Sequence, residues 1–183
     1  MSVLVGQPAP DFTAPAAFPG ESAANPMRTV SLSDYAGRWL LVLWYPGDFT
    51  FVCPTEILAF SDRMEEFADA ETDILAASVD SVYSHRAWAR TPRAENGIAG
   101  VGFPILSDAT HRISREWGIL LEDEGVTLRG LFILDPEGVV QYGALHNLNV
   151  GRSVDETLRV LAALQSGGLC GSDWKPGRET LTP

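Results

Sequence analysis

One of the two cysteines in this chain stands where a reactive thiol is expected. Cys53 lies in a loop, residues 45–56, between an apolar run at 39–44 and a run with helical spacing at 57–68. This order predicts a buried strand, a loop, and a helix that begins near Cys53 and ends at about residue 70. Free N–H groups and the dipole at a helix start favour an anion, so we expect a thiolate at neutral pH.

Two prolines support this boundary. Pro54 fits a first helical turn, where its missing N–H is not needed, and Glu56 is expected in the same first turn, where an acid suits the dipole. Pro46 stiffens the other end of the loop, so that a substrate meets a preformed pocket. The alternative is that Cys53 is a small core hydrophobe, as most free cysteines are. The polar, proline-bracketed loop favours the reactive interpretation.

These residues resemble the signature of a known family, the peroxiredoxins. The family's Pro-x-x-x-Thr-x-x-Cys segment is matched by Pro46, Thr50 and Cys53. The letters FTFVCPTE are similar to the typical two-cysteine subgroup, which includes the bacterial alkyl hydroperoxide reductase C component and the thioredoxin peroxidases. A family arginine at the start of a later strand corresponds to Arg129, and the resolving-cysteine segment to residues 168–177, which contain Cys170. The resemblance spans most of the chain.

The resemblance implies a thiol-dependent peroxidase that reduces hydrogen peroxide and organic hydroperoxides. Cys53 would become a sulfenic acid, and Cys170 from the neighbouring subunit of a homodimer would resolve it as an intersubunit disulfide. A thioredoxin-like protein or a flavoprotein disulfide reductase would then restore both thiols. Family members also assemble dimers into decameric rings, so a ring is expected here.

Attack on an O–O bond needs donors aimed at the developing negative charge. Thr50 is expected to hydrogen-bond the substrate oxygen or the thiolate, or to cap the helix. Arg129 resembles the guanidinium that polarises the peroxide, whereas without the resemblance it would be read as a solvated edge group. Glu56 either orients Arg129 or serves the helix dipole alone. The predicted site residues are Cys53, Cys170, Thr50, Arg129, Pro46 and Glu56.

Composition excludes several function classes. The chain has 183 residues, with 13 basic and 24 acidic side chains and a net charge of −11, which argues against a nucleic-acid partner. No apolar stretch approaches the roughly 18 residues of a membrane helix, and residues 1–8 lack a signal-peptide pattern, so a cytoplasmic protein is expected. The two cysteines and three histidines lack metal-ligand spacing, and no phosphate-binding loop occurs. We therefore expect no metal, no organic cofactor and no membrane partner.

No repeat or linker divides the sequence, so we expect a single domain over residues 1–183, with a tail from about 166 that carries Cys170. A strand at 74–79 would complete a strand-helix-strand unit. The pattern from Ser153 to Glu156 is that of a capping box and starts a helix that ends at Gly167. These features favour a thioredoxin-like α/β fold with a central mixed sheet flanked by helices. Other expected elements are helices at 83–90 and 109–117 and an antiparallel hairpin at 129–144.

Other function classes stay open. A disulfide oxidoreductase usually needs Cys-x-x-Cys, and the third position after Cys53 is Glu56. A one-cysteine-type peroxidase with an external resolving thiol is the closest variant, and Cys170 argues against it. A redox-regulated chaperone is a further alternative.

Residues 96–100 also depart from the Gly-Gly-Leu-Gly loop of peroxide-sensitive family members, so we expect Cys53 to resist overoxidation.

Overall fold

The computed structural model describes residues 5–20 and 27–182, and the chain divides into two compact units. The first unit comprises residues 1–152 and carries Cys53, and the second comprises residues 153–183 and carries Cys170. The single domain expected from the sequence over residues 1–183 stays a prediction.

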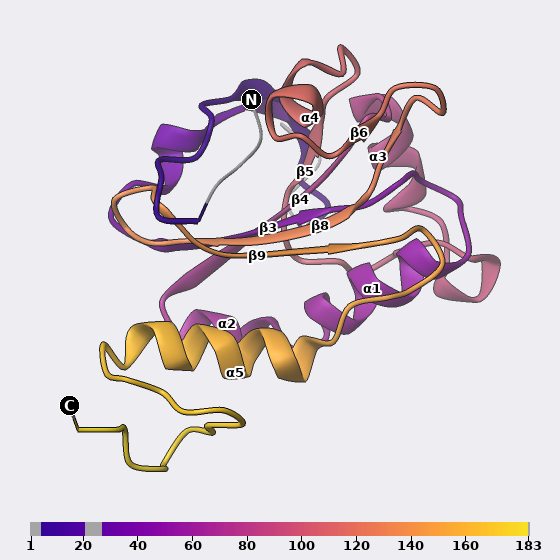
Figure 1. The fold of residues 1–183 in the computed structure, drawn as a ribbon. Coiled ribbons are helices and arrows are strands. Elements are labelled where there is room, and N and C mark those ends of the chain that lie inside the picture. The colour runs from indigo at the N-terminus through magenta and orange to yellow at the C-terminus, as the bar shows by residue number, and fades with distance from the viewer. Residues whose placement is uncertain (1–4, 21–26, 183) are drawn as a thin grey trace. The chain divides into compact units, whose positions relative to one another are not determined.

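A mixed β-sheet forms the centre of the first unit (Figure 1). β3 pairs in parallel with β4 and antiparallel with β8, while β8 and β9 form the predicted hairpin. The strand-helix-strand unit expected around Cys53 is therefore confirmed. Within the described residues the sheet has seven strands, in the spatial order β2 (Met27–Ser31), β1 (Thr13–Ala17), β5 (Ile105–Ser107), β4 (Thr72–Ser78), β3 (Trp39–Trp44), β8 (Arg129–Leu134) and β9 (Val140–His146).

The central strands are apolar on both faces, which fits a sheet covered by helices on both sides. Residues 40–44 of β3 are at most 1% exposed, and every residue of β8 is buried. In Figure 1, α1 and α2 lie on one side of the sheet, and α3 and α4 lie on the other. The expected α/β class is confirmed for this unit. Its helices are α1 (Val52–Ser61), α2 (Met64–Asp69), α3 (Val82–Trp88) and α4 (Arg112–Glu116), with the 3-10 turns η1 (Leu32–Tyr35) and η2 (Arg93–Glu95).

The helix that carries Cys53 is shorter than predicted. It was expected to continue to about residue 70, but α1 ends at Ser61 and the chain leaves the helical conformation at Arg63, with φ −117° and ψ 20°. The carboxylate of Asp62 is bound there by both terminal nitrogens of Arg93, at 2.8 and 3.0 Å. That partner is 31 positions away, so the sequence around the break carries no signal for it.

Other boundaries also differ from the sequence-based expectation. α4 begins later than predicted because His111 is left-handed, with φ 58°, and the carboxylate of Asp108 accepts the N–H groups of Ile113 and Ser114. Strands β1, β2 and β5 were not predicted; each is short, and β1 contains Pro15. A small hairpin of β6 (Leu120–Leu121) and β7 (Val126–Thr127) was also not predicted.

The second unit consists of helix α5 (Val154–Gln165) and the segment after it. The hydroxyl of Ser153 accepts the N–H of Glu156 at 3.2 Å, which confirms the predicted helix start. Gly167 has φ 65°, a conformation that suits a glycine just beyond a helix end. The segment then folds back on itself through a bridge between Leu169 and Leu181. None of the helices in the described residues of the chain is long and apolar enough to cross a membrane.

Candidate active site

Cys53 lies where the sequence predicted it, at the start of a helix that follows a buried strand. It is the second residue of α1, and the loop that leads to it begins where β3 ends. Its side chain is fully buried. The N-cap residue of α1 is Phe51, and among the described residues it makes no side-chain cap hydrogen bond. The first N–H groups of the helix are therefore not capped by the side chain of this residue.

Arg129, the first residue of β8, brings a positive charge to the Cys53 sulfur. Its Nη1 lies 3.3 Å from Sγ of Cys53, and its Nε and Nη2 donate to the carbonyl of Leu148 at 2.8 and 2.6 Å. Arg129 is only 3% exposed, so the alternative of a solvated edge group is wrong. The Leu148 carbonyl, which lies in the loop after β9, thus holds the guanidinium beside the thiol.

Glu56 pairs with Arg129, as one of the two sequence interpretations expected. Nη1 of Arg129 donates to Oε2 of Glu56 at 2.5 Å, and both side chains are at most 3% exposed. The expected first-turn position was wrong, because α1 begins at Val52 and Glu56 falls in its second turn. The Glu56 carboxylate thus pairs with the guanidinium of Arg129 and does not lie in the first turn of the helix.

Arg152, which the sequence analysis did not identify, completes this cluster. Its backbone N–H and Nε donate to Oε1 of Glu56 at 2.8 and 2.7 Å, and its Nη2 donates to Oε2 at 3.1 Å. Its Nη1 donates to the carbonyls of Trp44 and Gly130 at 2.8 and 2.7 Å. Arg152 stands directly before the helix-capping Ser153, but its carboxylate partner is 96 positions away. Local sequence signals therefore could not reveal it.

The electrostatics of the cluster follow from its burial and pairing. Burial alone would raise the pKa of Glu56, but the hydrogen bonds and charge of Arg152, together with the charge of Arg129, hold that pKa below its ordinary value. Burial lowers the pKa of Arg152, and Glu56 offsets part of this effect. Two guanidinium groups thus surround one carboxylate. A thiolate at Cys53 would bring the formal charge of the four groups to zero.

Thr50 and Pro46 lie in the loop before α1. The hydroxyl of Thr50 donates to the carbonyl of Gly47 at 2.9 Å, which leaves its oxygen free to accept a hydrogen bond from a substrate. Because the N-cap position belongs to Phe51, the helix-cap interpretation of Thr50 is wrong. Pro46 is buried next to the end of β3.

The same loop is anchored through Asp48, a residue that the sequence analysis did not single out. Its carboxylate accepts from Tyr45 Oη at 2.7 Å and lies 2.9 Å from Nδ1 of His85, a fully buried histidine of α3. Its backbone N–H donates to Asp80 at 2.9 Å. These bonds connect the loop to the opposite layer of helices.

The chain that carries this arrangement of residues is similar to a known family and to several known proteins. The sequence profile described as the AhpC/TSA family matches residues 5–143. The chain belongs to the AhpC/TSA family. It is 51% identical over 185 residues to the chloroplastic 2-Cys peroxiredoxin BAS1 of Hordeum vulgare, covering 98% of this chain and 86% of that protein. It is 48% identical over 187 residues to a thioredoxin peroxidase of Echinococcus granulosus, covering 100% of this chain and 94% of that protein.

Solved structures agree with the assignment to the AhpC/TSA family. The reduced 2-Cys peroxiredoxin of Plasmodium vivax is 39% identical, with a TM-score of 0.92 over 98% of this chain and 93% of that chain. AhpC of Mycobacterium tuberculosis is 38% identical, with a TM-score of 0.83 over 96% of this chain and all of that chain. The predicted peroxiredoxin resemblance, the thioredoxin-like fold and the assignment as a thiol-dependent peroxidase are confirmed at the level of the family.

Cys170, the other thiol of this AhpC/TSA chain, has different surroundings within the second unit. It is half-buried, its Sγ lies 3.3 Å from the hydroxyl of Ser166, and it contacts the carbonyl of Ala163 at 3.8 Å. Both cysteines are free thiols. The assignment of Cys170 as the resolving residue stays a prediction.

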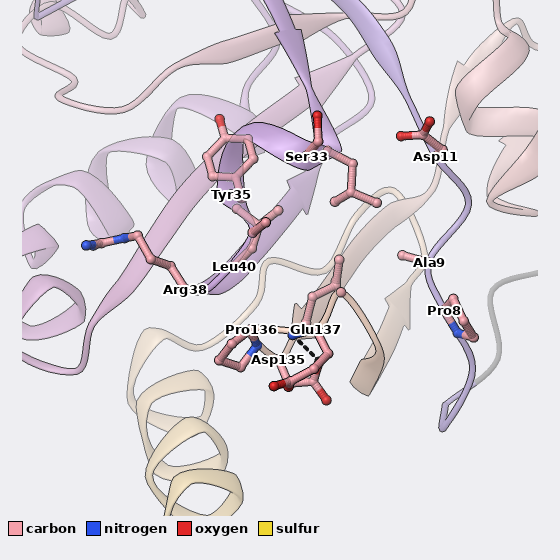
Figure 2. Close-up of a pocket in the computed structure, with 14 residues that line it drawn as sticks. Pro8, Ala9, Asp11, Ser33, Tyr35, Arg38, Leu40, Asp135, Pro136 and Glu137 are labelled. Carbon is pink, nitrogen blue, oxygen red and sulfur yellow. Dashed lines mark hydrogen bonds between the residues drawn. The ribbon is translucent and has the colours of Figure 1, made fainter.

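A separate cavity of about 340 Å³ lies at the opposite end of β3 from Cys53. Figure 2 shows residues from three segments around it, including Pro8, Tyr35 and Pro136. Neither cysteine lines this cavity.

Among the residues that the structure describes, no group of three His, Cys, Asp or Glu side chains is placed to hold a metal ion.

Proposed function

We propose that the chain is a two-cysteine peroxidase in which Cys53 attacks the peroxide and Cys170 resolves the product. The observation that carries this proposal is the buried Cys53 sulfur at a helix start, 3.3 Å from Nη1 of Arg129. The buried cluster of Arg129, Arg152 and Glu56 has a formal charge of +1, and a thiolate balances it. A buried charge without a counter-charge is costly, so the cluster supports an anionic sulfur.

The first step consumes the peroxide. The Cys53 thiolate attacks one oxygen of the hydroperoxide, so that an S–O bond forms and the O–O bond breaks. The sulfur loses two electrons and becomes a sulfenic acid after proton transfer, while the second oxygen leaves as alkoxide or hydroxide and is protonated to alcohol or water. Arg129 donates to the oxygens on which charge develops, and the Thr50 hydroxyl oxygen accepts a hydrogen bond from the bound peroxide. Glu56 orients Arg129, and Pro46 shapes the pocket.

The second step forms the disulfide. The Cys170 thiol attacks the sulfenic sulfur of Cys53, an S–S bond forms, and water leaves. We place this Cys170 on the neighbouring subunit of a homodimer. Strand β9 supports such a dimer, because it is the last strand of the sheet. Among the described residues, β8 is the only strand that pairs with it, while Val140 at its start also exchanges backbone hydrogen bonds with Gly6 and Gln7. The part of its outer edge beyond Val140 is open to a second copy. Leu145 of this strand is 52% exposed. An unpaired strand edge with an exposed apolar side chain offers a surface to a second copy.

Exposed aromatic side chains support further assembly into the expected ring of dimers. Phe51 is 87% exposed, Phe49 is 49% exposed, and Tyr83 of α3 is 71% exposed. The first two flank Thr50 in the active-site loop, and α3 is the helix that anchors this loop through His85. Large exposed aromatic residues are typical of interface cores. Association at this surface would cover the loop that leads into Cys53.

A dithiol reductant must restore both thiols, and we propose a thioredoxin-like protein or a flavoprotein disulfide reductase as the electron donor. The reaction as written needs no metal or organic cofactor. Two alternative functions, a one-cysteine-type peroxidase and a redox-regulated chaperone, stay predictions. The expected cytoplasmic location also stays a prediction.

The experiment that tests the proposal uses reduced protein and one equivalent of hydrogen peroxide. After the remaining thiols are blocked, a non-reducing gel of the wild type should show a disulfide-linked dimer, which Cys53→Ser and Cys170→Ser should both lack. Mass spectrometry of Cys170→Ser should show Cys53 oxidised, and that of Cys53→Ser should show an intact Cys170. A wild type that stays monomeric while Cys53 is consumed would place resolution elsewhere. Two unreacted thiols would exclude the peroxidase.

A further inference from the structure

The cavity of about 340 Å³ at the start of β3 has three walls, all from the first unit (Figure 2). The walls are residues 8–11 before β1, residues 32–40 around η1 and the start of β3, and residues 134–138 between β8 and β9. Its volume falls within the range of roughly 300–1,000 Å³ that is typical of small-ligand sites. No residue that lines it takes part in the proposed reaction with peroxide.

Backbone hydrogen bonds join these walls in pairs. With the N–H donor named first, they run from Ala9 to Gly138 at 3.0 Å, from Gly37 to Pro136 at 2.9 Å, and from Leu32 to Phe12 at 3.1 Å. Each wall is therefore bound to both of the others. The cavity is formed before any ligand arrives, as is usual for small-molecule sites.

The interior of the cavity is mostly apolar. Leu40 and Leu134 are at most 1% exposed, and both belong to the hydrophobic core together with Ala9. Tyr35 adds an aromatic ring to the lining and packs against the same core. An aromatic ligand gains apolar contact with the leucines and ring packing with Tyr35.

Two carboxylates at the edge of the cavity have no partner. Asp11 and Glu137 come from different walls, both are exposed, and neither carboxylate has a hydrogen bond or an ion pair within the described part of the chain (Figure 2). The other charged lining residues are occupied. Arg38 binds Asp73 through two bonds at 2.8 and 3.2 Å, and the carboxylate of Asp135 accepts N–H groups of its own turn. The lining thus offers two negative charges to a ligand.

Tyr35 responds to the same negative surroundings. Burial raises the pKa of Tyr35, the charges of Asp73 and Asp34 raise it further, and the charge of Arg28 offsets part of this effect. Surroundings that disfavour a phenolate also disfavour an anionic ligand. They favour a ligand that carries a positive charge.

We propose that this cavity binds a small aromatic molecule that carries an ammonium group. The ring lies among Leu40, Leu134 and Tyr35, and the ammonium group lies at the edge beside Asp11 and Glu137. None of the large apolar side chains that are exposed in the described residues lines the cavity. A protein partner would therefore find little apolar surface around it, which favours a free small molecule as the occupant.

The test uses tryptamine as the cationic probe, indole-3-acetate as the anion with the same ring system, and indole as the neutral ring. Binding to the full-length reduced chain is detected by saturation-transfer difference NMR, and each Kd is obtained by titration. For tryptamine we expect a Kd of roughly 0.1–1 mM, as is usual for a ligand of this size. Indole-3-acetate should bind roughly tenfold more weakly. Added salt should weaken the binding of tryptamine but not that of indole.

Variants of the lining locate the site. Ala36→Trp fills the cavity from an exposed position and should abolish binding of both tryptamine and indole. Asp11→Asn combined with Glu137→Gln should raise the Kd of tryptamine roughly fivefold and leave that of indole unchanged. The matched control is Asp123→Asn combined with Glu124→Gln, which changes the net charge equally at two exposed acids between β6 and β7, outside the cavity. It should bind all three probes as the wild type does.

Circular dichroism and thermal melting establish that each variant is folded. If Ala36→Trp does not fold, the two double variants still decide the outcome, because all four of their positions are exposed. Four results would each overturn the proposal: no saturation transfer to tryptamine at millimolar concentration, equal affinity for tryptamine and indole-3-acetate, equal loss of affinity in the two double variants, or unchanged binding to a folded Ala36→Trp. None of these results depends on whether Cys53 reacts with peroxide.

Discussion

The two thiols of this chain stand in contrasting surroundings. Cys53 is fully buried beside Arg129 and Glu56, which are themselves at most 3% exposed. Cys170 is half-buried and contacts one hydroxyl and one carbonyl, both from residues at most seven positions away. The first environment is built from groups far apart in the sequence, and the second is local.

This difference matches the work that each thiol is proposed to do. A thiol that attacks an O–O bond needs charges fixed before the substrate arrives, because groups already in place do not have to reorganise during the reaction. A thiol that must reach a sulfenic acid on another subunit benefits from few attachments. We therefore expect substitutions around Cys53 to have large effects and similar substitutions around Cys170 to have small ones.

The largest effect is expected at Arg129. Arg129→Ala should lower the second-order rate of Cys53 oxidation by roughly 10²–10³-fold, the usual loss for one well-aimed donor. Arg129→Lys should recover only part of the rate, because a point charge cannot contact Cys53, Glu56 and the carbonyl of Leu148 as the planar fork does. Stopped-flow fluorescence in a Cys170→Ser background measures these rates.

The control for Arg129 is Arg112→Ala, which removes an exposed arginine that pairs with Glu116 at 3.0 Å. Its rate should stay within about twofold of the wild type, since exposed ion pairs contribute little. An Arg129→Ala variant that reacts as fast as this control would show that the guanidinium plays no part in peroxide reduction.

The next largest effect is expected on the stability of the folded protein when Glu56 is replaced. Glu56→Gln leaves two buried guanidinium groups without a counter-charge, and removing one partner of a buried pair typically costs about 3–5 kcal/mol. We expect a loss of this order in the free energy of unfolding at pH 7, measured by urea denaturation. Glu122→Gln removes the partner of an exposed arginine and should leave the unfolding midpoint nearly unchanged.

The Glu56 effect should also depend on pH. The folded-state pKa of Glu56 is lowered, mainly because Arg152 and Arg129 outweigh the penalty of burial. The carboxylate therefore stabilises the folded protein above the unfolded-state pKa, which is about 4.3. This stabilisation is lost as the pH falls through the lower folded-state pKa. The difference between wild type and Glu56→Gln should therefore narrow as the pH drops below about 4, and a difference that grew there would contradict the assignment.

The sequence predicted those parts of the molecule that depend on local pattern. The apolar run of β3, the helix start at Cys53 and the Ser153 cap each follow from neighbouring residues, and each is present in the structure. The resemblance to the family supplied Arg129, which local pattern alone would have assigned to a solvated edge.

The parts that could not be predicted depend on contacts between distant residues. Arg152 binds Glu56 across 96 positions, and Asn96 binds Thr50 across 46. The break after α1 coincides with a side chain that arrives from η2. In each case the partner is brought near only when the chain folds, so the residue's own neighbours in the sequence give no indication of it.

The smallest effect is expected beside Cys170. Ser166→Ala removes the hydroxyl that lies 3.3 Å from the Cys170 sulfur, in a segment where Ser166 itself is exposed. An exposed hydrogen bond exchanges readily with water, so its loss should change the rate of disulfide formation by less than about twofold. The same stopped-flow assay, with Cys170 intact, measures that rate against the wild type. A large change would mean that the Cys170 thiol is also held in a fixed geometry, and the contrast between a fixed attacking thiol and a loosely attached resolving thiol would then fail.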